Sequence, residues 1–201
     1  MTTAETTQHV YDHFATEFDQ KRGKSLFEKA WLDRFLAFVP SGGHVLDVGC
    51  GSGDPIAAYL MGKGFQVTGI DASPAMIDLA RSKYPGSKWA VQDMRTLSAS
   101  DQWDGVIAWN SFFHLTRPDQ RKVLPKLANL VKPGGPLMIT TGTGDGEALG
   151  QVAGQPVYHA SLTTESYTDI LEHNGCTVQR VTLTDPDCQQ HSVLLAQKTD
   201  D

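Results

Sequence analysis

A short apolar run followed by alternating glycines constrains the fold of this chain more than any other feature. The sequence VLDV at 45–48 is followed by GCGSGD at 49–54, and Pro55 stands where the first turn of a helix would begin. Glycines at every second position let the backbone turn tightly and approach a ligand closely. The free amides of the following helix N-terminus would add hydrogen-bond donors. Alone, the pattern also fits a plain strand-to-helix turn.

Apolar runs and amphipathic segments alternate beyond this loop. Strands are predicted near 45–48, 65–70, 88–92, 103–109 and 137–141, and helices near 55–61, from 74 onward and over about 118–131. This alternation predicts a doubly wound α/β fold with a mostly parallel sheet covered on both faces. Such sheets bind ligands beyond the carboxyl ends of their strands, at the switch in strand order. The glycine loop is therefore the predicted site.

Further elements are predicted at both ends of the chain. Apolar residues recur every four positions in two series within residues 1–40, which predicts two amphipathic helices: Val10, Phe14 and Phe18, then Phe27, Trp31 and Phe35. Pro125 is expected to kink or shorten its helix. Residues 142–162 are predicted to be mostly loop, followed by a helix at 163–173. Strands near 177–183 and 192–197 can pair as a hairpin. The length of 201 residues predicts a single domain over 1–201.

An acidic residue accompanies the glycine loop. Asp71 ends the second predicted strand, 22 residues after Gly49. In nucleotide-binding sheets an acid at this position accepts hydrogen bonds from the ribose hydroxyls. Asp71 could instead cap the next helix, although Ser73 can also fill that role. The loop and Asp71 together favour an adenosine ligand.

Five segments in order carry a family resemblance. VLDVGCGSG at 45–53, with Asp47 two residues before the first glycine, resembles the first motif of class I S-adenosylmethionine-dependent methyltransferases. The fingerprint of NAD-binding sheets places its third glycine one position later than Gly53. The second to fifth motifs are resembled by VTGIDASPAMIDLAR at 67–81, AVQDMRTL at 90–97, WDGVIAWNSFFHL at 103–115 and LVKPGGPLMITT at 130–141. The resemblance runs from about residue 44 to 198.

The resemblance implies a fold and a cofactor. The fold would be a Rossmann-like α/β core over 44–198, whose seven-stranded, mostly parallel sheet has an antiparallel last strand, preceded by two extra N-terminal helices. The cofactor would be S-adenosyl-L-methionine, with S-adenosyl-L-homocysteine as its product. Its methionine end would face the loop of Gly49, Gly51 and Gly53 beside Asp47, and its ribose would meet Asp71.

The resemblance also implies contacts outside the loop. Ala72 and Met76 would lie near the adenine, Asp93 would meet its amino group, and Met94 would lie on its ring face. YDHFATEFD at 11–19 is similar to the N-terminal helix of many small-molecule members, so residues 1–40 would form a helical lid in which Tyr11 covers the cofactor. For Tyr11 and Phe18, packing against the sheet is the alternative. Trp109 would line the cofactor pocket or pack in the core.

Methyl transfer needs little from the protein beyond positioning. The nucleophile must be held about 3 Å from the transferred methyl and on axis, and a general base helps if it starts with a proton. His114 lies in NSFFHL, similar to an NxLHHL-like pattern in related enzymes, and an ordinary histidine pKa suits a base. Tyr158 and His159 could orient or deprotonate an acceptor. The alternatives are a structural His114 and a surface loop with a buried Tyr158. Arg95, next to Met94, could pair with an anionic acceptor, but the sequence favours a solvated surface arginine.

Composition limits the partners and the chemistry. The net charge of −6 and the sequence pI of about 5.6 show no basic footprint for nucleic acid. No apolar run reaches the roughly 18 residues of a membrane span, and residues 1–10 are polar without a signal-like segment, so a cytoplasmic protein is expected. Three cysteines without a CxxC pair, and scattered histidines, give no metal site. The sequence leaves the oligomeric state open.

These observations predict methyl transfer to an oxygen, nitrogen, sulfur or carbon nucleophile of a small-molecule acceptor, by in-line displacement. Residues 1–40 and 142–162 leave room for only a modest cap, which favours a compact acceptor. One alternative is a noncatalytic S-adenosylmethionine-binding regulatory protein, in which the acceptor pocket would be filled or absent. Another is an NAD-dependent oxidoreductase, which would share only the glycine loop and the ribose acid.

Overall fold

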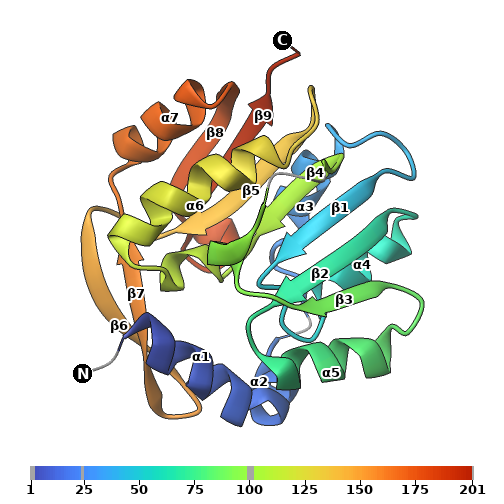
Figure 1. Ribbon diagram of the computed structural model, residues 1–201, viewed down its shortest axis with the longest axis vertical. Helices are drawn as coiled ribbons and strands as arrows, with labels where there is room; N and C mark the ends of the chain where they lie inside the picture. The colour runs from blue at the N-terminus through green and yellow to red at the C-terminus, as the bar shows by residue number, and fades with distance from the viewer. Residues whose placement is uncertain (1–2, 24, 99–101, 201) are drawn as a thin grey trace.

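A seven-stranded sheet forms the centre of the molecule (Figure 1). The computed structural model describes residues 3–23, 25–98 and 102–200. The strand order is β3-β2-β1-β4-β5-β9-β8. The strands are β1 (His44–Val48), β2 (Gln66–Asp71), β3 (Lys88–Val91), β4 (Gly105–Ala108), β5 (Pro136–Thr141), β8 (Cys176–Asp185) and β9 (His191–Lys198). β1 to β5 pair in parallel and β9 is antiparallel to both of its neighbours, which confirms the predicted fold class.

Helices cover both faces of this sheet. They are α3 (Lys29–Leu36), α4 (Ile56–Gly62), α5 (Pro74–Lys83), α6 (Arg117–Asn129) and α7 (Thr164–His173), with short 3-10 turns η1 (Met94–Thr96), η2 (Phe112–His114) and η3 (Pro186–Cys188). Strand β1 shows why two cores form. Leu46 and Val48 pack in one apolar cluster and Val45 packs in the other, because successive side chains of a strand point to opposite faces.

The strand order reverses beside β1. β2 pairs with one edge of β1 and β4 pairs with the other, and the chain passes from one side of the sheet to the other between β3 and β4. The carboxyl ends of β1, β2 and β4 therefore meet at a topological switch point, where open α/β sheets bind ligands.

The N-terminal region contains three helices where the sequence predicts two. The first predicted helix is divided into α1 (Ala4–His13) and α2 (Ala15–Lys21) at Phe14, whose φ of −104° and ψ of 19° are not helical. The Phe14 amide still donates to the Val10 carbonyl at 3.0 Å. The four-residue spacing of the apolar side chains therefore continues across the break. Both helices contact α5, and α1 also contacts β7, so the break lets α1 reach the hairpin while α2 stays on α5.

The prediction of mostly loop over 142–162 is wrong. Strands β6 (Gly146–Val152) and β7 (Gln155–Ser161) form a separate two-stranded antiparallel sheet. Their turn is Ala153-Gly154, with φ of 49° and 75°, which is the double positive φ of a tight type I′ hairpin. Most of β6 is exposed, so it lacks the apolar alternation by which a strand is predicted.

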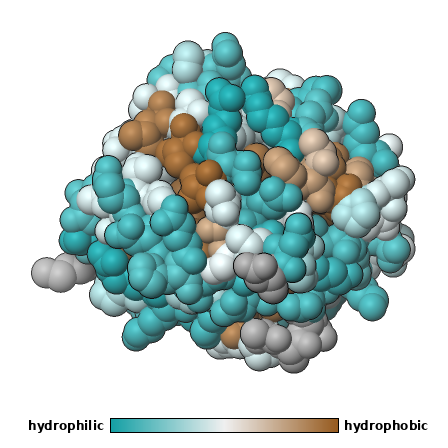
Figure 2. All heavy atoms as spheres, turned by 90° about the horizontal axis from the view of Figure 1, so that it is seen from above, coloured by the Kyte–Doolittle hydropathy of each residue, from teal (hydrophilic) through white to brown (hydrophobic). Residues whose placement is uncertain are grey.

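Pro125 is expected to kink or shorten α6, and the helix is not shortened, because it continues to Asn129. The carbonyl that loses its amide partner belongs to Arg121, and Arg121 is exposed, so water can satisfy that carbonyl. Among the described residues, no helix is both long and apolar enough to cross a membrane. The end of the molecule opposite α1 is mostly hydrophilic, with separate apolar patches (Figure 2).

Candidate functional site

A cavity lies at the carboxyl ends of β1, β2 and β4. The space not filled by atoms is about 1130 Å³, counted together with the open solvent at its mouth. Helix α1 forms one wall through Thr7, Gln8 and Tyr11. The predicted cofactor residues that line it are Tyr11, Asp47, Gly49, Gly51, Asp71, Ala72, Met76, Asp93, Met94 and Trp109. Of the predicted acceptor residues, His114 also lines it.

The glycine loop approaches the segment after β4 more closely than any side chain would allow. Gly49 has a φ of 75°, and a Cβ at this position would lie 2.2 Å from the Cβ of Ser111. The Ser111 hydroxyl donates to the Val48 carbonyl at 2.6 Å, which holds the two segments together. Gly53 does not line the cavity and packs instead against Tyr84 and Trp89. The first two glycines therefore shape the cavity, and Gly53 supports the turn behind them.

Asp71 connects the glycine loop to the segment that follows β2. Its carboxylate accepts hydrogen bonds from the Gly51 amide at 2.9 Å and the Ser73 amide at 2.8 Å. The Ser73 hydroxyl accepts from the Met76 amide and is thus the N-cap of α5, so Asp71 is not needed as that cap. Burial raises the pKa of Asp71, against the lowering effect of its two amide donors.

Asp47 adds a second carboxyl group beside Asp71. Asp47 is 2% exposed. Burial, followed by the nearby charge of Asp71, raises the pKa of Asp47 to about 7. A buried and a partly buried acid that line one cavity favour a positively charged ligand there, because a cation would stabilise both carboxylates.

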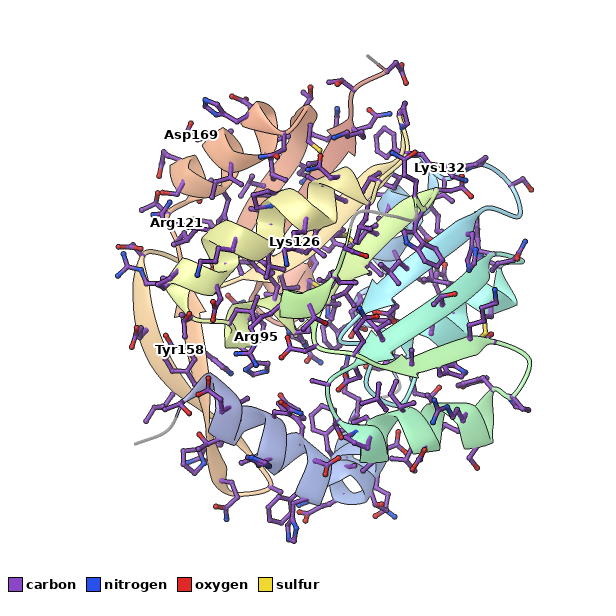
Figure 3. All side chains as sticks on the ribbon, viewed as in Figure 1. Arg95, Arg121, Lys126, Lys132, Tyr158 and Asp169 are labelled. Carbon is purple, nitrogen blue, oxygen red and sulfur yellow. The ribbon has the colours of Figure 1, made fainter. Side chains whose placement is uncertain are left out.

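The end of the cavity beyond Asp71 carries a third acid. Asp93 accepts from the Arg95 amide at 2.8 Å and from the Arg95 guanidinium at 2.9 and 2.6 Å. Burial raises the pKa of Asp93, but Arg95 outweighs it and lowers the pKa below its ordinary value. Figure 3 shows Arg95 between α1 and α6. Arg95 lines the cavity and pairs with Asp93, which differs from the solvated arginine that the sequence favours.

Tyr11 and His114 form a hydrogen-bonded pair on the cavity wall. Nε2 of His114 lies 3.1 Å from the Tyr11 hydroxyl, and Nδ1 lies 2.8 Å from the Tyr158 carbonyl. A carbonyl only accepts, so Nδ1 carries the proton, and in the neutral ring Nε2 accepts from Tyr11. Burial lowers the pKa of His114 to about 4. The imidazole is therefore neutral near pH 7 and offers Nε2 as a base.

Tyr158 and His159 lie outside the cavity wall. The Tyr158 amide donates to the Thr7 hydroxyl at 2.8 Å and its carbonyl accepts from His114, so this residue of β7 supports α1 and η2 through its backbone (Figure 3). The His159 ring packs 4.9 Å from His114 and 4.7 Å from Phe113, measured between ring centres. Their contact with an acceptor stays a prediction.

Several cavity residues escape the sequence analysis. Arg22 lines the cavity near α2 and pairs with Glu28. Asn110 follows β4 with a φ of 51°, and its Oδ1 atom is buried without a hydrogen-bond partner within the described residues. An asparagine is one of the few residues that adopts a positive φ readily, so its place directly after a predicted strand was an available signal. Arg22 has no such signal.

Polar contacts fix α1 and α2 beside the cavity. Asp12 accepts from the Ser73 hydroxyl at 2.7 Å and the Ala75 amide at 3.0 Å. Asp19 on α2 pairs with Lys83 of α5 and accepts from the Ser52 hydroxyl of the glycine loop. Trp109 packs in an apolar cluster and also lines the cavity. In the described ranges, no group of three or more metal-ligating side chains comes together.

Comparisons with known proteins agree with this arrangement. A family model described as a methyltransferase domain matches residues 45–135. Trans-aconitate 2-methyltransferase of Escherichia coli O157:H7 (strain EC4115 / EHEC) is 32% identical over 181 residues, which cover 84% of this chain and 67% of that protein. Glycine N-methyltransferase of Rattus norvegicus is 36% identical over 178 residues, covering 77% and 59%. The chain spans just over half of two of its curated relatives, 54% and 59% of their lengths.

A solved structure shows the same fold. It is the 1,6-didemethyltoxoflavin-N1-methyltransferase of Burkholderia thailandensis with bound 1,6-didemethyltoxoflavin and S-adenosylhomocysteine. It matches with a TM-score of 0.72 at 20% identity, covering 100% of this chain and 92% of that one. The likeness therefore includes the N-terminal helices as well as the sheet.

Proposed function

This chain belongs to the class I S-adenosylmethionine-dependent methyltransferase family, and we propose that it transfers a methyl group from S-adenosylmethionine to a small-molecule acceptor. The observation that carries the proposal is the cavity between the glycine loop and Asp71. Gly49 lets the loop pack directly against Ser111, where a Cβ would clash, and Asp71 presents a carboxylate fixed by the Gly51 amide. These features fit an adenosine-containing ligand at the switch point of the sheet.

The charges of the cavity fit a sulfonium donor. Asp47 is buried and Asp71 is partly buried, and both line the cavity. A cation between them would compensate their desolvation. When bound, S-adenosylmethionine would supply a methyl group on positively charged sulfur, which a nucleophile would attack in line as the methyl–sulfur bond breaks and neutral S-adenosylhomocysteine leaves. The contribution of Asp47 is to hold the positively charged part of this ligand next to the glycine loop.

The adenine end of the proposed site contains Ala72, Met76, Asp93 and Met94. Met76 and Met94 supply apolar, polarizable surface to this part of the cavity. Asp93 can accept from an exocyclic amino group while its contacts with Arg95 hold the carboxylate in place. Arg95 is therefore proposed as a residue that positions Asp93 rather than as a contact for the acceptor.

We propose the Tyr11–His114 pair as the proton acceptor of the reaction. As the nucleophile of the acceptor loses its proton, Tyr11 can take that proton on its oxygen while its own proton moves to Nε2 of His114. The Tyr158 carbonyl holds the ring in the tautomer that this transfer requires. Burial, then the charge of Asp71, raises the pKa of Tyr11, so Tyr11 enters the reaction as a neutral phenol.

Tyr158 and His159 are proposed in supporting roles. His159 packs against His114 and Phe113, where it limits the movement of the His114 ring. The Tyr158 backbone holds α1 and His114 together through hydrogen bonds to Thr7 and Nδ1. A direct contact with the acceptor would require the acceptor to reach beyond the cavity wall.

The acceptor is proposed to be a compact small molecule. Helices α1 and α2 contribute Thr7, Gln8, Tyr11 and Phe18 to the lining of the cavity. By their names, two relatives act on glycine and on trans-aconitate. Both names support an acceptor of low molecular mass for this chain. The atom that receives the methyl group is an oxygen, nitrogen, sulfur or carbon nucleophile.

Calorimetric titration with S-adenosylmethionine, S-adenosylhomocysteine and NAD tests the cofactor. Micromolar binding of the first two without NAD binding is the expected result, and binding of NAD alone would exclude the proposal. Turnover is then tested with a panel of small acids, amines, phenols and thiols, by following S-adenosylhomocysteine. Binding without turnover on any class of acceptor would favour a noncatalytic cofactor-binding protein.

A further inference from the structure

We propose that strand β6 pairs with β6 of a second copy of this chain, antiparallel and across a two-fold axis at Leu149. The two-stranded sheets of the two copies would then form one continuous sheet. The inference goes beyond the proposed function and does not depend on it, because all residues of β6 are described and none of them lines the cavity. Figure 1 shows β6 at the margin of the molecule, with β7 on its inner side.

The outer edge of β6 presents backbone groups that β7 does not pair. Within the described residues, β6 has β7 as its one neighbouring strand. Pro156 of β7 has no amide hydrogen, and the Tyr158 amide donates to the Thr7 hydroxyl. These two residues therefore occupy non-hydrogen-bonded positions of the ladder, and so do their partners Gln151 and Leu149. The amides and carbonyls of Gln151 and Leu149 consequently point away from β7, toward the free edge.

The edge strands of the large sheet carry features that oppose pairing with another chain. Natural edge strands are commonly short, bulged or positively charged for this reason. β3 has four residues and begins at Lys88. The register of β8 is shifted between Val178 and Arg180 and again between Thr182 and Asp185, and such bulges interrupt a ladder. β6 has seven residues in unbroken register, without lysine, arginine or proline.

Glu147 is the one charged residue of β6, and its position does not oppose pairing. Its carboxylate accepts a hydrogen bond from the Tyr158 hydroxyl of the same hairpin. Across the proposed axis it lies opposite Gln151 of the second copy, which carries no charge and offers an amide donor. No two like charges therefore meet along the paired strands.

The sequence of β6 is self-complementary about Leu149. With the axis there, Leu149 faces its own copy, Glu147 faces Gln151, and Ala148 faces Gly150. The Leu149 side chain is 65% exposed in the single chain, and contact between the two leucines removes apolar surface from water. An axis at Glu147 would instead place two carboxylates opposite each other. An axis at Gln151 would place Leu149 beside the turn.

A second copy satisfies both sides of this edge with one geometry. In the proposed register the Leu149 pair and both Glu147–Gln151 pairs are hydrogen-bonded positions, and each exchanges two backbone hydrogen bonds. The contact is isologous, so it closes at two chains and does not continue into a fibre. It involves one strand from each chain, which places it at the small end of protein interfaces. We therefore expect a weak dimer that depends on protein concentration.

Sedimentation velocity of the full chain over a wide range of concentrations tests the dimer. L149K places two positive charges opposite each other on the axis. L149P removes an outward amide while the β6–β7 ladder keeps its hydrogen bonds, as Pro156 does in β7. L183K is the matched control, because Leu183 is also exposed and lies on the edge strand β8. Cooperative thermal unfolding confirms that each variant is folded.

The expected result is a mass that rises with concentration from 21.9 kDa toward twice that value for the wild type. L149K and L149P should raise the dissociation constant about tenfold or more, as expected when backbone hydrogen bonds are lost. L183K should match the wild type. A wild type that stays monomeric at every concentration would overturn the proposal. Dissociation by L183K and not by L149K would place the contact on β8 instead.

A cross-linking experiment tests the register. Cα atoms of a hydrogen-bonded antiparallel pair lie about 5.5 Å apart, a distance that a disulfide spans, so L149C should form a disulfide-linked dimer on mild oxidation. The three native cysteines are buried, which leaves the introduced thiol as the accessible one. Q151C is the control, because its two copies would lie about 14 Å apart along the strands. Equal cross-linking of L149C and Q151C would indicate random collision and exclude the axis at Leu149.

Discussion

The carboxylate of Asp71 accepts a hydrogen bond from the Gly51 amide at 2.9 Å, which connects the end of β2 to the loop that follows β1. This contact lets one side chain organise the glycine loop while it presents charge to the cavity. A ligand that bonds to Asp71 therefore meets a loop whose position is already set.

Replacing Asp71 with Ala should weaken S-adenosylhomocysteine binding about 10- to 100-fold, because a charged hydrogen-bond acceptor is lost. Calorimetry measures the change. Asp78→Ala is the matched control, since Asp78 lies exposed on α5 and does not line the cavity. Affinity within twofold of the wild type in folded D71A protein would place the ribose elsewhere.

Gly49→Ala should destabilise the protein and abolish cofactor binding. A positive φ costs a non-glycine residue roughly 1–2 kcal/mol, and the new Cβ would lie 2.2 Å from the Ser111 Cβ, so the loop and the segment after β4 must separate. Urea unfolding and calorimetry measure the two effects. Gly62→Ala is the control, because its Cβ meets no atom within 4 Å and alanine favours a helix. Equal behaviour of the two variants would exclude the close approach.

Stability should depend on pH through His114. Its pKa falls from an ordinary 6.5 to about 4 in the folded protein, so between these values the unfolded chain binds more protons. The stabilising contribution is complete above about pH 6.5 and is lost as the pH falls toward 4. In urea unfolding over this window, His114→Gln should lose less stability than the wild type. Parallel curves for the two proteins would mean that His114 titrates normally.

Asp47 should act with the opposite sign. Its pKa rises from an ordinary 3.8 to about 7, so its contribution is complete below about pH 3.8 and is lost as the pH rises toward 7. Asp47→Asn should therefore gain stability relative to the wild type as the pH rises. A D47N protein whose relative stability changes in the same direction as that of H114Q would contradict this assignment.

The parts of the fold that the sequence predicts are those with a local signal. Some local patterns indicate backbone conformation directly: apolar runs, glycines before a helix and an acid at a strand end. This is why the predicted succession of β1 to β5 along the chain is confirmed. The β6–β7 hairpin has no such signal, because Gly146, Gly150 and exposed side chains interrupt the alternation. The break at Phe14 depends on the surfaces that α1 and α2 contact, and these lie far away in sequence.

The residues of the candidate site also divide into those with a local sequence signal and those without one. The motif positions assign cofactor contacts to Asp47, Gly49, Asp71 and Asp93, and all four line the same cavity. Their contact with the cofactor stays a prediction. Arg22 and Asp12 could not be found in this way, since their roles arise from contacts with Glu28 and with the N-terminus of α5 that only the folded chain creates. His159 illustrates the reverse case. The sequence predicts that it contacts the acceptor, but its ring packs against His114 and Phe113 and does not line the cavity.

Tyr11→Phe should lower turnover more than cofactor affinity. The substitution keeps the ring that packs 5.2 Å from Phe18 and removes the hydroxyl that bonds to His114. Loss of general-base catalysis costs about 10²- to 10⁴-fold in turnover. Steady-state kinetics and calorimetry separate the two quantities once an acceptor is known. His159→Gln should reduce turnover less, and a larger loss for H159Q than for Y11F would transfer the proton-accepting role to His159.

Asp12→Asn should accelerate both entry and release of S-adenosylhomocysteine. Asp12 fixes α1 to the N-terminus of α5 through Ser73 and Ala75, and the Ala75 amide is the main cause of its lowered pKa. Because α1 forms a wall of the cavity, its displacement should gate exchange of the ligand. Stopped-flow fluorescence should show dissociation about tenfold faster, the equivalent of one charged hydrogen bond. Glu17→Gln, an exposed substitution in the ion pair with Lys21 on α2, is the control for charge alone. If D12N and E17Q release the ligand at the wild-type rate, then α1 is a fixed wall, and the ligand must exchange through the existing mouth of the cavity.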